Sequence, residues 1–121
     1  MNRKILTVDD SPTVRLVLSS TLRDAGYEVI EACDGQEALD CLGGDDINML
    51  ITDLNMPKVD GIDLIRQVRR TRGFRFVPII MLTTESEEEK KREGKAAGAS
   101  GWILKPFKPE QLLAVVNMVM V

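Results

Sequence analysis

Short apolar runs alternate with segments of helical periodicity five times along the chain. Four of these runs have the character of buried β-strands and cover residues 4–8, 48–52, 77–82 and 101–104, whereas residues 27–32 alternate enough to be a strand nearer an edge. The segments between them carry apolar residues at three- and four-residue spacing, as Val14, Val17, Leu18 and Leu22 do in the first. Strands that alternate with helices favour βαβ units. We therefore expect an α/β fold with a five-stranded parallel sheet and helices on both of its faces.

Residues that favour helix ends refine this pattern. Two capping boxes are expected, Asp34 with Glu37 before the second helix and Ser86 with Glu89 before the fourth. Pro109 suits the first position of the last helix, because its fixed φ angle is already helical and its missing N–H has no partner there. The fourth helix is highly charged, and such a run is typical of a solvated face.

The composition fits one globular domain over residues 1–121. Hydrophobic residues make up 44% of the chain, enough for a sizeable core, and we expect no attached output domain. A net charge of −3 argues against non-specific nucleic-acid binding. No apolar run approaches the roughly 20 residues that span a bilayer, and the N-terminus is too short and acidic for a signal peptide. We expect a cytoplasmic protein without membrane insertion.

The residue types restrict the chemistry. The chain has no histidine, which removes the commonest general base and zinc ligand and any Ser-His-Asp triad. Cys33 and Cys41 do not form a Cys-x-x-Cys motif, and reduced, partly buried thiols are the simplest interpretation. Any chemistry must therefore use carboxylates, hydroxyls, lysine or a hard metal ion.

Polar groups follow the predicted strands at their carboxyl ends. Asp9 and Asp10 follow the first strand, Asp53 the third, Thr83 the fourth and Lys105 the fifth. In a parallel sheet these ends meet at one edge, where ligands bind. Clustered carboxylates repel one another, and a Mg²⁺ ion relieves that repulsion. A magnesium ion beside a carboxylate and a lysine suits a phosphoryl group, and aspartate is an established nucleophile for phosphoryl chemistry.

Each of these residues also has a simpler interpretation. Asp9 and Asp10 suit a helix cap, Asp53 the start of a turn, Thr83 an N-terminal turn residue, and Lys105 a solvated lysine. The joint occurrence of all five at strand ends favours the site.

Four short motifs carry a family resemblance. They are Val8-Asp9-Asp10-Ser11, Asp53-Leu54-Asn55-Met56-Pro57, Met81-Leu82-Thr83-Thr84 and Leu104-Lys105-Pro106-Phe107. In this order and at these intervals, the chain resembles the receiver domains of two-component response regulators, most closely the stand-alone CheY-like chemotaxis type. The resemblance covers essentially the whole chain. It implies the flavodoxin-like, CheY-like fold with strand order 2-1-3-4-5.

The resemblance also implies roles for individual residues. Asp53 would be the phosphoacceptor, phosphorylated by a histidine kinase. Asp10 and Asp53 would bind Mg²⁺ through their carboxylates and Asn55 through its main-chain carbonyl, whereas Asp9 would act mainly through metal-bound water. Lys105 would pair with the phosphoryl oxygens, and its peptide bond to Pro106 is expected to be cis.

The same resemblance implies a switch that involves Thr83 and an aromatic residue. Thr83 would hydrogen-bond the phosphoryl group and move toward it. The family commonly has Tyr or Phe where this chain has Trp102, and indole is larger than phenol, so an inward swing is sterically harder. Asn55 and Glu85 occupy the positions that tune dephosphorylation in the family. Their polar and acidic nature predicts a short-lived phosphorylated form.

The resemblance implies signalling by binding rather than by catalysis of an external reaction. The only reactions expected are self-catalysed phosphorylation and dephosphorylation. The partner surface would comprise the helix after Ser86, the fifth strand and the last helix, and a flagellar motor switch protein is the typical target. A phosphatase is a further expected partner, and the chain is expected to be a monomer. The alternatives within this class are a phosphate sink or a phosphorelay intermediate.

Two other classes fit the sequence less well. A phosphatase of the haloacid dehalogenase type also uses an aspartate nucleophile and magnesium, but its acids stand in an Asp-x-Asp arrangement after the first strand, whereas Asp9 and Asp10 are adjacent. A flavodoxin-like cofactor binder needs a first loop rich in Ser, Thr or Gly to cradle phosphate, and two aspartates there would repel it.

Overall fold

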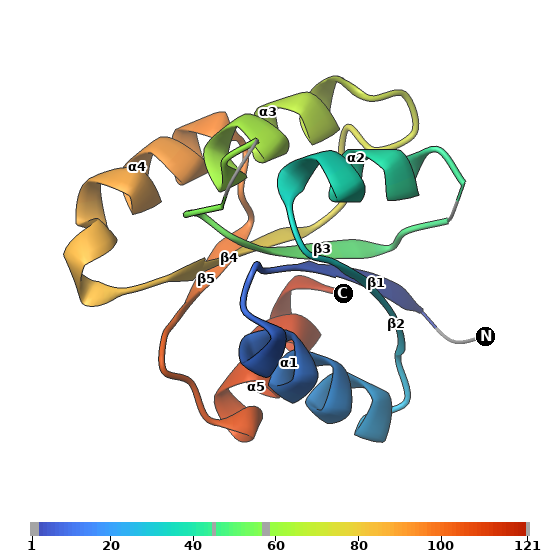
Figure 1. Ribbon diagram of the computed structural model, residues 1–121, viewed down its shortest axis with the longest axis vertical. Helices are drawn as coiled ribbons and strands as arrows, with labels where there is room; N and C mark the ends of the chain where they lie inside the picture. The colour runs from blue at the N-terminus through green and yellow to red at the C-terminus, as the bar shows by residue number, and fades with distance from the viewer. Residues whose placement is uncertain (1–2, 45, 57–58, 121) are drawn as a thin grey trace.

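Five parallel strands form one sheet in the computed structural model (Figure 1), which describes residues 3–44, 46–56 and 59–120. The strand order is β2-β1-β3-β4-β5, which confirms the predicted topology. The strands are β1 (Lys4–Val8), β2 (Glu28–Ala32), β3 (Met49–Asp53), β4 (Ile79–Thr83) and β5 (Gly101–Leu104). The helices are α1 (Pro12–Asp24), α2 (Gly35–Leu42), α3 (Gly61–Arg70), the 3-10 helix η1 (Glu85–Glu87), α4 (Glu88–Ala97) and α5 (Pro109–Val119).

Helices cover both faces of the sheet, with α2, α3 and α4 on one side and α1 and α5 on the other (Figure 1). Successive strand residues point to opposite faces, so the central strands β1, β3 and β4 contribute to both cores. Leu6 and Leu50 pack in the core under α2 and α3, whereas Ile5 and Ile51 pack with Leu18 and other residues of α1 and α5. Burial on both faces explains why β3 and β4 are almost continuously apolar, whereas the edge strand β2 carries Glu28 and Glu31.

The strand order changes direction between β1 and β3. The chain moves from β1 to β2 on one side, then returns past β1 to build β3, β4 and β5 on the other. The helices that follow β1 and β3 therefore lie on opposite faces, and their loops diverge at the carboxyl edge of the sheet (Figure 1). This is the place where open parallel sheets bind ligands.

Two strands extend one residue further than predicted. Asp53 is the last residue of β3, where it pairs with Leu82, and Thr83 is the last residue of β4, where it pairs with Leu104. A polar side chain did not end the strand, because the backbone ladder continues regardless of what the side chain does at the edge. The two functional candidates are thus held in the sheet rather than in loops.

The capping box predicted for Ser86 and Glu89 is wrong. Glu87 instead accepts a hydrogen bond from the backbone N–H of Thr84 at 2.8 Å, and a 3-10 turn precedes α4. The sequence offers Glu at three successive positions, and the pair that forms is Thr84 with Glu87, two residues earlier than predicted. The predicted cap by Asp34 is confirmed, because its side chain accepts a hydrogen bond from Glu37 N at 2.8 Å.

Arg69 joins three segments behind α3. Its guanidinium donates hydrogen bonds to the carbonyl oxygens of Gly98, Phe74, Arg75 and Val77. Burial lowers the pKa of Arg69. These contacts tie the end of α3 and the loop that follows it to the end of α4.

Within the part of the chain that the structure describes, no helix has both the length and the apolar character needed to cross a bilayer.

Candidate functional site

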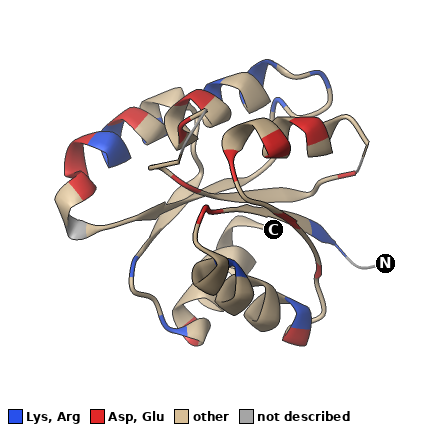
Figure 2. Cartoon of the chain, viewed as in Figure 1, with Lys and Arg blue, Asp and Glu red and all other residues tan. Residues whose placement is uncertain are grey.

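Three carboxylates meet at the carboxyl edge of the sheet. Asp9 and Asp10 follow β1, and Asp53 ends the neighbouring strand β3; each offers a carboxylate oxygen within 4.8 Å of the others. Asp9 and Asp53 are buried, whereas Asp10 is exposed. Figure 2 shows this acidic group where β1 and β3 end. The predicted convergence of strand ends is therefore observed for these three residues.

Backbone N–H groups fix the two buried carboxylates. Asp9 Oδ1 accepts from Ser11 N at 2.9 Å, and Asp53 Oδ1 accepts from Leu54 N at 2.9 Å. Ser11, rather than either aspartate, is the N-cap of α1, because its side chain accepts from Val14 N at 3.3 Å. Helix capping therefore does not account for Asp9 and Asp10.

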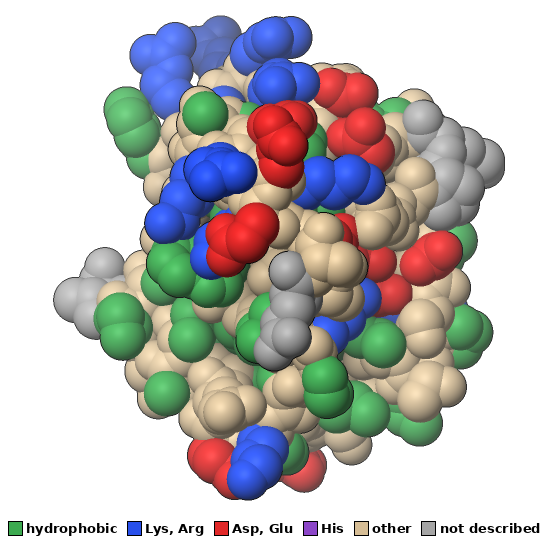
Figure 3. All heavy atoms as spheres, turned by 90° about the vertical axis from the view of Figure 1, so that its left-hand side faces the viewer, with side chains coloured by type: hydrophobic (Ala, Val, Ile, Leu, Met, Phe, Trp, Pro, Cys, Tyr) green, Lys and Arg blue, Asp and Glu red, His purple; other side chains and the backbone are tan. Residues whose placement is uncertain are grey.

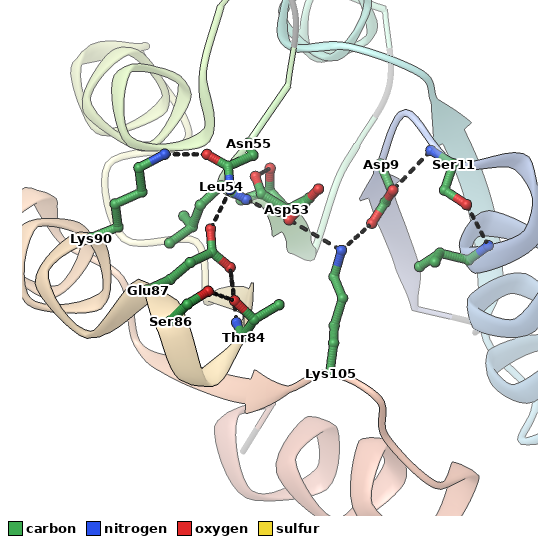
Figure 4. A network of polar contacts seen from close by, with 12 residues as sticks. Asp9, Ser11, Asp53, Leu54, Asn55, Thr84, Ser86, Glu87, Lys90 and Lys105 are labelled. Carbon is green, nitrogen blue, oxygen red and sulfur yellow. Dashed lines mark hydrogen bonds and ion pairs between the residues drawn. The ribbon is translucent and has the colours of Figure 1, made fainter.

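Lys105 brings the cation to this acidic group from the end of β5 (Figure 4). Its Nζ lies 3.1 Å from Asp9 Oδ2 and 3.2 Å from Asp53 Oδ1. Burial alone lowers the pKa of Lys105, but the charges of Asp53 and Asp9 outweigh it, and the pKa is raised overall. Lys105 is thus a charged group that both carboxylates share, and the peptide bond to Pro106 is cis, as predicted.

Asp53 lies in an environment that disfavours its charge. Burial raises its pKa first and the neighbouring Asp9 raises it further, while Lys105 and the Leu54 N–H oppose this without cancelling it. A second cation at the site would relieve the remaining repulsion.

A glycine allows the next helix to start directly behind Asp53. A Cβ atom on Gly61 would lie 2.2 Å from the carbonyl oxygen of Asp53 and 2.6 Å from Leu54 Cα. Only a residue without a side chain fits at this contact. The N-terminus of α3 therefore packs against the backbone that carries the phosphoacceptor candidate.

A polar network flanks Asp53 on the side of α4 (Figure 4). Asn55 donates from Nδ2 to Glu87 Oε2 at 2.5 Å, and its Oδ1 accepts from the ammonium of Lys90. The other oxygen of Glu87 accepts from Thr84 N and Thr84 Oγ1 at 2.8 and 2.9 Å. Sequence analysis assigned no role to Glu87 or Lys90, because a run of charged residues does not reveal which side chains point toward Asn55.

Thr83 and Trp102 line a common cavity of about 300 Å³, together with Thr84, Glu88, Lys91 and Leu104. Thr83 is buried, whereas Trp102 is 40% exposed. The ammonium groups of Lys91 and Lys95 lie 4.5 and 3.9 Å from the centre of the indole ring, as cation–π contacts do. The predicted pair of Thr83 and Trp102 is thus brought to one place, with the indole on the outer side.

The acidic group fits a magnesium ion by the chemistry of its donors. Three hard carboxylate oxygens converge, and the exposed Asp10 leaves the site open to water, which magnesium retains. Two predicted features lie outside the described part of the chain, namely Pro57 of the second motif and the side chain of Glu85.

Comparison with known proteins agrees with this geometry. The family model of the response regulator receiver domain matches residues 5–117. The chain belongs to the response regulator receiver domain family. The matched region covers β1 from its second residue and β2 to β5 in full, and it includes the three acids and Lys105.

Chemotaxis proteins are among the relatives of this receiver. It is 42% identical to the chemotaxis protein CheY1 of Helicobacter pylori over 119 residues, which is 97% of this chain and 96% of the relative. The chemotaxis protein CheY4 of Vibrio cholerae superimposes with a TM-score of 0.94 at 48% identity, over 98% of this chain and 99% of that one. A third similar structure is the receiver domain of a sensor histidine kinase from Pseudomonas aeruginosa, solved with magnesium in its active-site cleft. It superimposes with a TM-score of 0.91 at 28% identity, over 99% of this chain and 98% of that one.

Proposed function

We propose that this receiver is a phosphorylation-dependent switch of a two-component system that acts in chemotaxis, with Asp53 as its phosphoacceptor. One observation carries the proposal: the buried Asp53 carboxylate has an oxygen within 4.8 Å of those of Asp9 and Asp10 and shares the ammonium of Lys105 with Asp9. The similarity to chemotaxis proteins over almost the whole chain supports the process.

The phosphodonor is a histidine kinase, and the transfer is a direct displacement. An oxygen of Asp53 attacks the phosphorus of phosphohistidine, the new O–P bond forms as the N–P bond breaks, and the imidazole nitrogen keeps the electron pair. Lys105 pairs with a phosphoryl oxygen, and the Thr83 hydroxyl donates to another. The raised pKa of Asp53 makes its carboxylate a better nucleophile once it is ionised.

A magnesium ion belongs to this function. Asp10 and Asp53 would hold it through carboxylates and Asn55 through its main-chain carbonyl, with Asp9 acting through water. When bound, the ion neutralises negative charge on the transferring oxygens. The magnesium described for the receiver from Pseudomonas aeruginosa supports this assignment.

The signal leaves by altered protein binding on the surface formed by α4, β5 and α5. On the face shown in Figure 3, acidic and basic side chains intermingle over the upper part, where α4 lies, and hydrophobic side chains gather below. Trp102, Leu104 and Met118 are the exposed large apolar residues of this surface, at 40, 44 and 74%. A motor switch protein in the cytoplasm is the proposed target, bound by a monomer of this chain.

Intact mass tests the switch directly. The protein is incubated with a small acyl-phosphate donor, with and without Mg²⁺, beside Asp53→Asn. A magnesium-dependent gain of one phosphoryl group, absent in Asp53→Asn, is expected. No gain under any condition would contradict the proposal. A phosphorylated protein that binds no target would point to the phosphate-sink role.

A further inference from the structure

Glu87 is an acidic side chain that the fold buries beside the site. It is 7% exposed, although it lies in a run of acids at the start of α4. Its two oxygens serve different partners: Oε1 accepts from the backbone and hydroxyl of Thr84, and Oε2 accepts from Asn55, which is 32 residues away in the chain. Glu87 therefore links the loop after β3 to the turn after β4.

The network has a fixed polarity. An ionised Glu87 can only accept hydrogen bonds, and an ammonium such as that of Lys90 can only donate them. The Asn55 amide between them has one donor end and one acceptor end. It is therefore held in a single orientation, with Nδ2 toward Glu87 and Oδ1 toward Lys90.

This orientation directs the amide away from the phosphoacceptor. In Figure 4 the Asn55 side chain points toward Glu87 and Lys90, on the side of Asp53 opposite to Lys105. Asn55 stands only two residues after Asp53, so a released amide is within reach of a water molecule beside a phosphoryl group there. A water molecule held in line with the phosphorus reacts faster than one that must find its orientation.

We propose that Glu87, assisted by Lys90, is a positioning residue that prolongs the phosphorylated state by holding the Asn55 amide away from the acyl phosphate. The inference rests on the proposed function and deepens it. The reaction that it slows is hydrolysis. A water oxygen bonds to phosphorus, the bond from phosphorus to the Asp53 oxygen breaks, the carboxylate keeps the electron pair, and the water protons pass to inorganic phosphate and solvent.

Glu87→Gln is the sharpest variant. Its remaining oxygen still accepts from Thr84 N, so the start of α4 keeps its cap, but its new N–H₂ group faces the Asn55 N–H₂ group. If the Asn55 amide turns over, its N–H₂ group faces the Lys90 ammonium instead, and two donors again oppose each other. The Asn55 amide therefore loses its hydrogen bond either to residue 87 or to Lys90, and its single orientation with it. The loss of one hydrogen bond corresponds to roughly a fivefold change in rate.

The experiment follows the phosphorylated protein by intact mass after the acyl-phosphate donor is removed, in excess Mg²⁺. We expect Glu87→Gln to lose its phosphoryl group roughly fivefold faster than the wild type, while its phosphorylation rate changes less than twofold. Lys90→Met, which frees the other end of the amide, is expected to act in the same direction. Glu89→Gln removes the same charge two residues later from an exposed position and should behave as the wild type.

A second background separates positioning from structural damage. In Asn55→Ala there is no amide to release, so adding Glu87→Gln should leave the rate of phosphoryl loss unchanged. An acceleration that persists in that background, or an unchanged rate in Glu87→Gln alone, would overturn the inference while the switch itself stands. A wild-type protein that never gains a phosphoryl group would overturn the proposed function and the inference together.

Discussion

The ammonium nitrogen of Lys105 lies 3.2 Å from Oδ1 of Asp53, across the sheet from β5 to β3. The same nitrogen lies 3.1 Å from Asp9, so one cation serves two buried carboxylates. Without it, neither carboxylate has an ion pair with another cation in the described part of the chain.

Replacing Lys105 by Met should therefore destabilise the protein most when magnesium is absent. We expect a loss of about 1–2 kcal/mol in the free energy of unfolding in the presence of a chelator, less than for a fully buried pair because Lys105 is partly exposed. Added Mg²⁺ should recover much of that loss. Urea denaturation with chelator and with Mg²⁺ measures both, and Lys108→Met removes the same charge from an exposed position. Equal losses in the two variants would contradict the shared-cation interpretation.

The raised pKa of Asp53 gives stability a defined pH dependence. The Asp53 carboxyl holds its proton more tightly in the folded chain than in the unfolded chain, where its pKa has the ordinary value of 3.8. Ionisation of Asp53 therefore destabilises the folded protein. This destabilisation is absent below the unfolded pKa and reaches its full size above the folded pKa. Without metal, Asp53→Asn should be more stable than the wild type at pH 7, and the gain should shrink as the pH falls toward 4. Urea denaturation at several pH values in chelator tests this, and a gain that grows toward pH 4 would count against it.

Gly61→Ala should displace the backbone that carries Asp53. The added Cβ meets the backbone of Asp53 and Leu54 at 2.2 and 2.6 Å, and backbone atoms cannot move aside as a flexible side chain can. We expect a loss of about 2–4 kcal/mol and weaker Mg²⁺ binding. Gly44→Ala is the matched control, because a Cβ there has no neighbour within 4 Å. Thermal unfolding and Mg²⁺ titration of both variants would reveal whether the contact matters.

Arg69→Met should lower stability without touching the acidic site. It removes the donors to four backbone carbonyls and leaves several of these oxygens without a partner. A loss of about 2–4 kcal/mol is expected. Arg70→Met, at the exposed neighbouring position, should change stability by less than about 0.5 kcal/mol. Similar losses for the two arginines would mean that charge, rather than the hydrogen bonds, explains the effect.

Trp102 is the single tryptophan of the chain, so its fluorescence reports on one place. The indole shares a cavity with Thr83 and carries two ammonium groups on its ring. If Thr83 moves toward a phosphoryl group on Asp53, the surroundings of the indole change. We expect its emission to shift with the acyl-phosphate donor and Mg²⁺, and to stay constant in Asp53→Asn. A constant emission in a fully phosphorylated wild type would separate Trp102 from the switch.

The sequence predicted the sheet and its acidic edge because both depend on patterns that a linear chain displays. The central strands are mostly apolar, and Asp9, Asp53 and Lys105 stand at or directly after strand ends. The contacts of Glu87 and Lys90 escaped prediction because seven charged residues, 87–93, follow one another there. Only the position of the loop after β3 decides which of them turn toward it. The starting point of α4 was wrong for a related reason, since several Ser, Thr and Glu residues compete for the same cap.

Asp9 and Lys105 are 96 residues apart in the chain, so the acidic site is assembled late during synthesis. β1, the first strand to be synthesised, lies inside the sheet, whereas β5, which precedes the cation, is an edge strand added near the end of the chain. During synthesis the three carboxylates exist before the lysine that pairs with two of them. A nascent chain thus has the three carboxylates but not the complete acidic site, which forms only when β5 docks and brings Lys105 to Asp9 and Asp53.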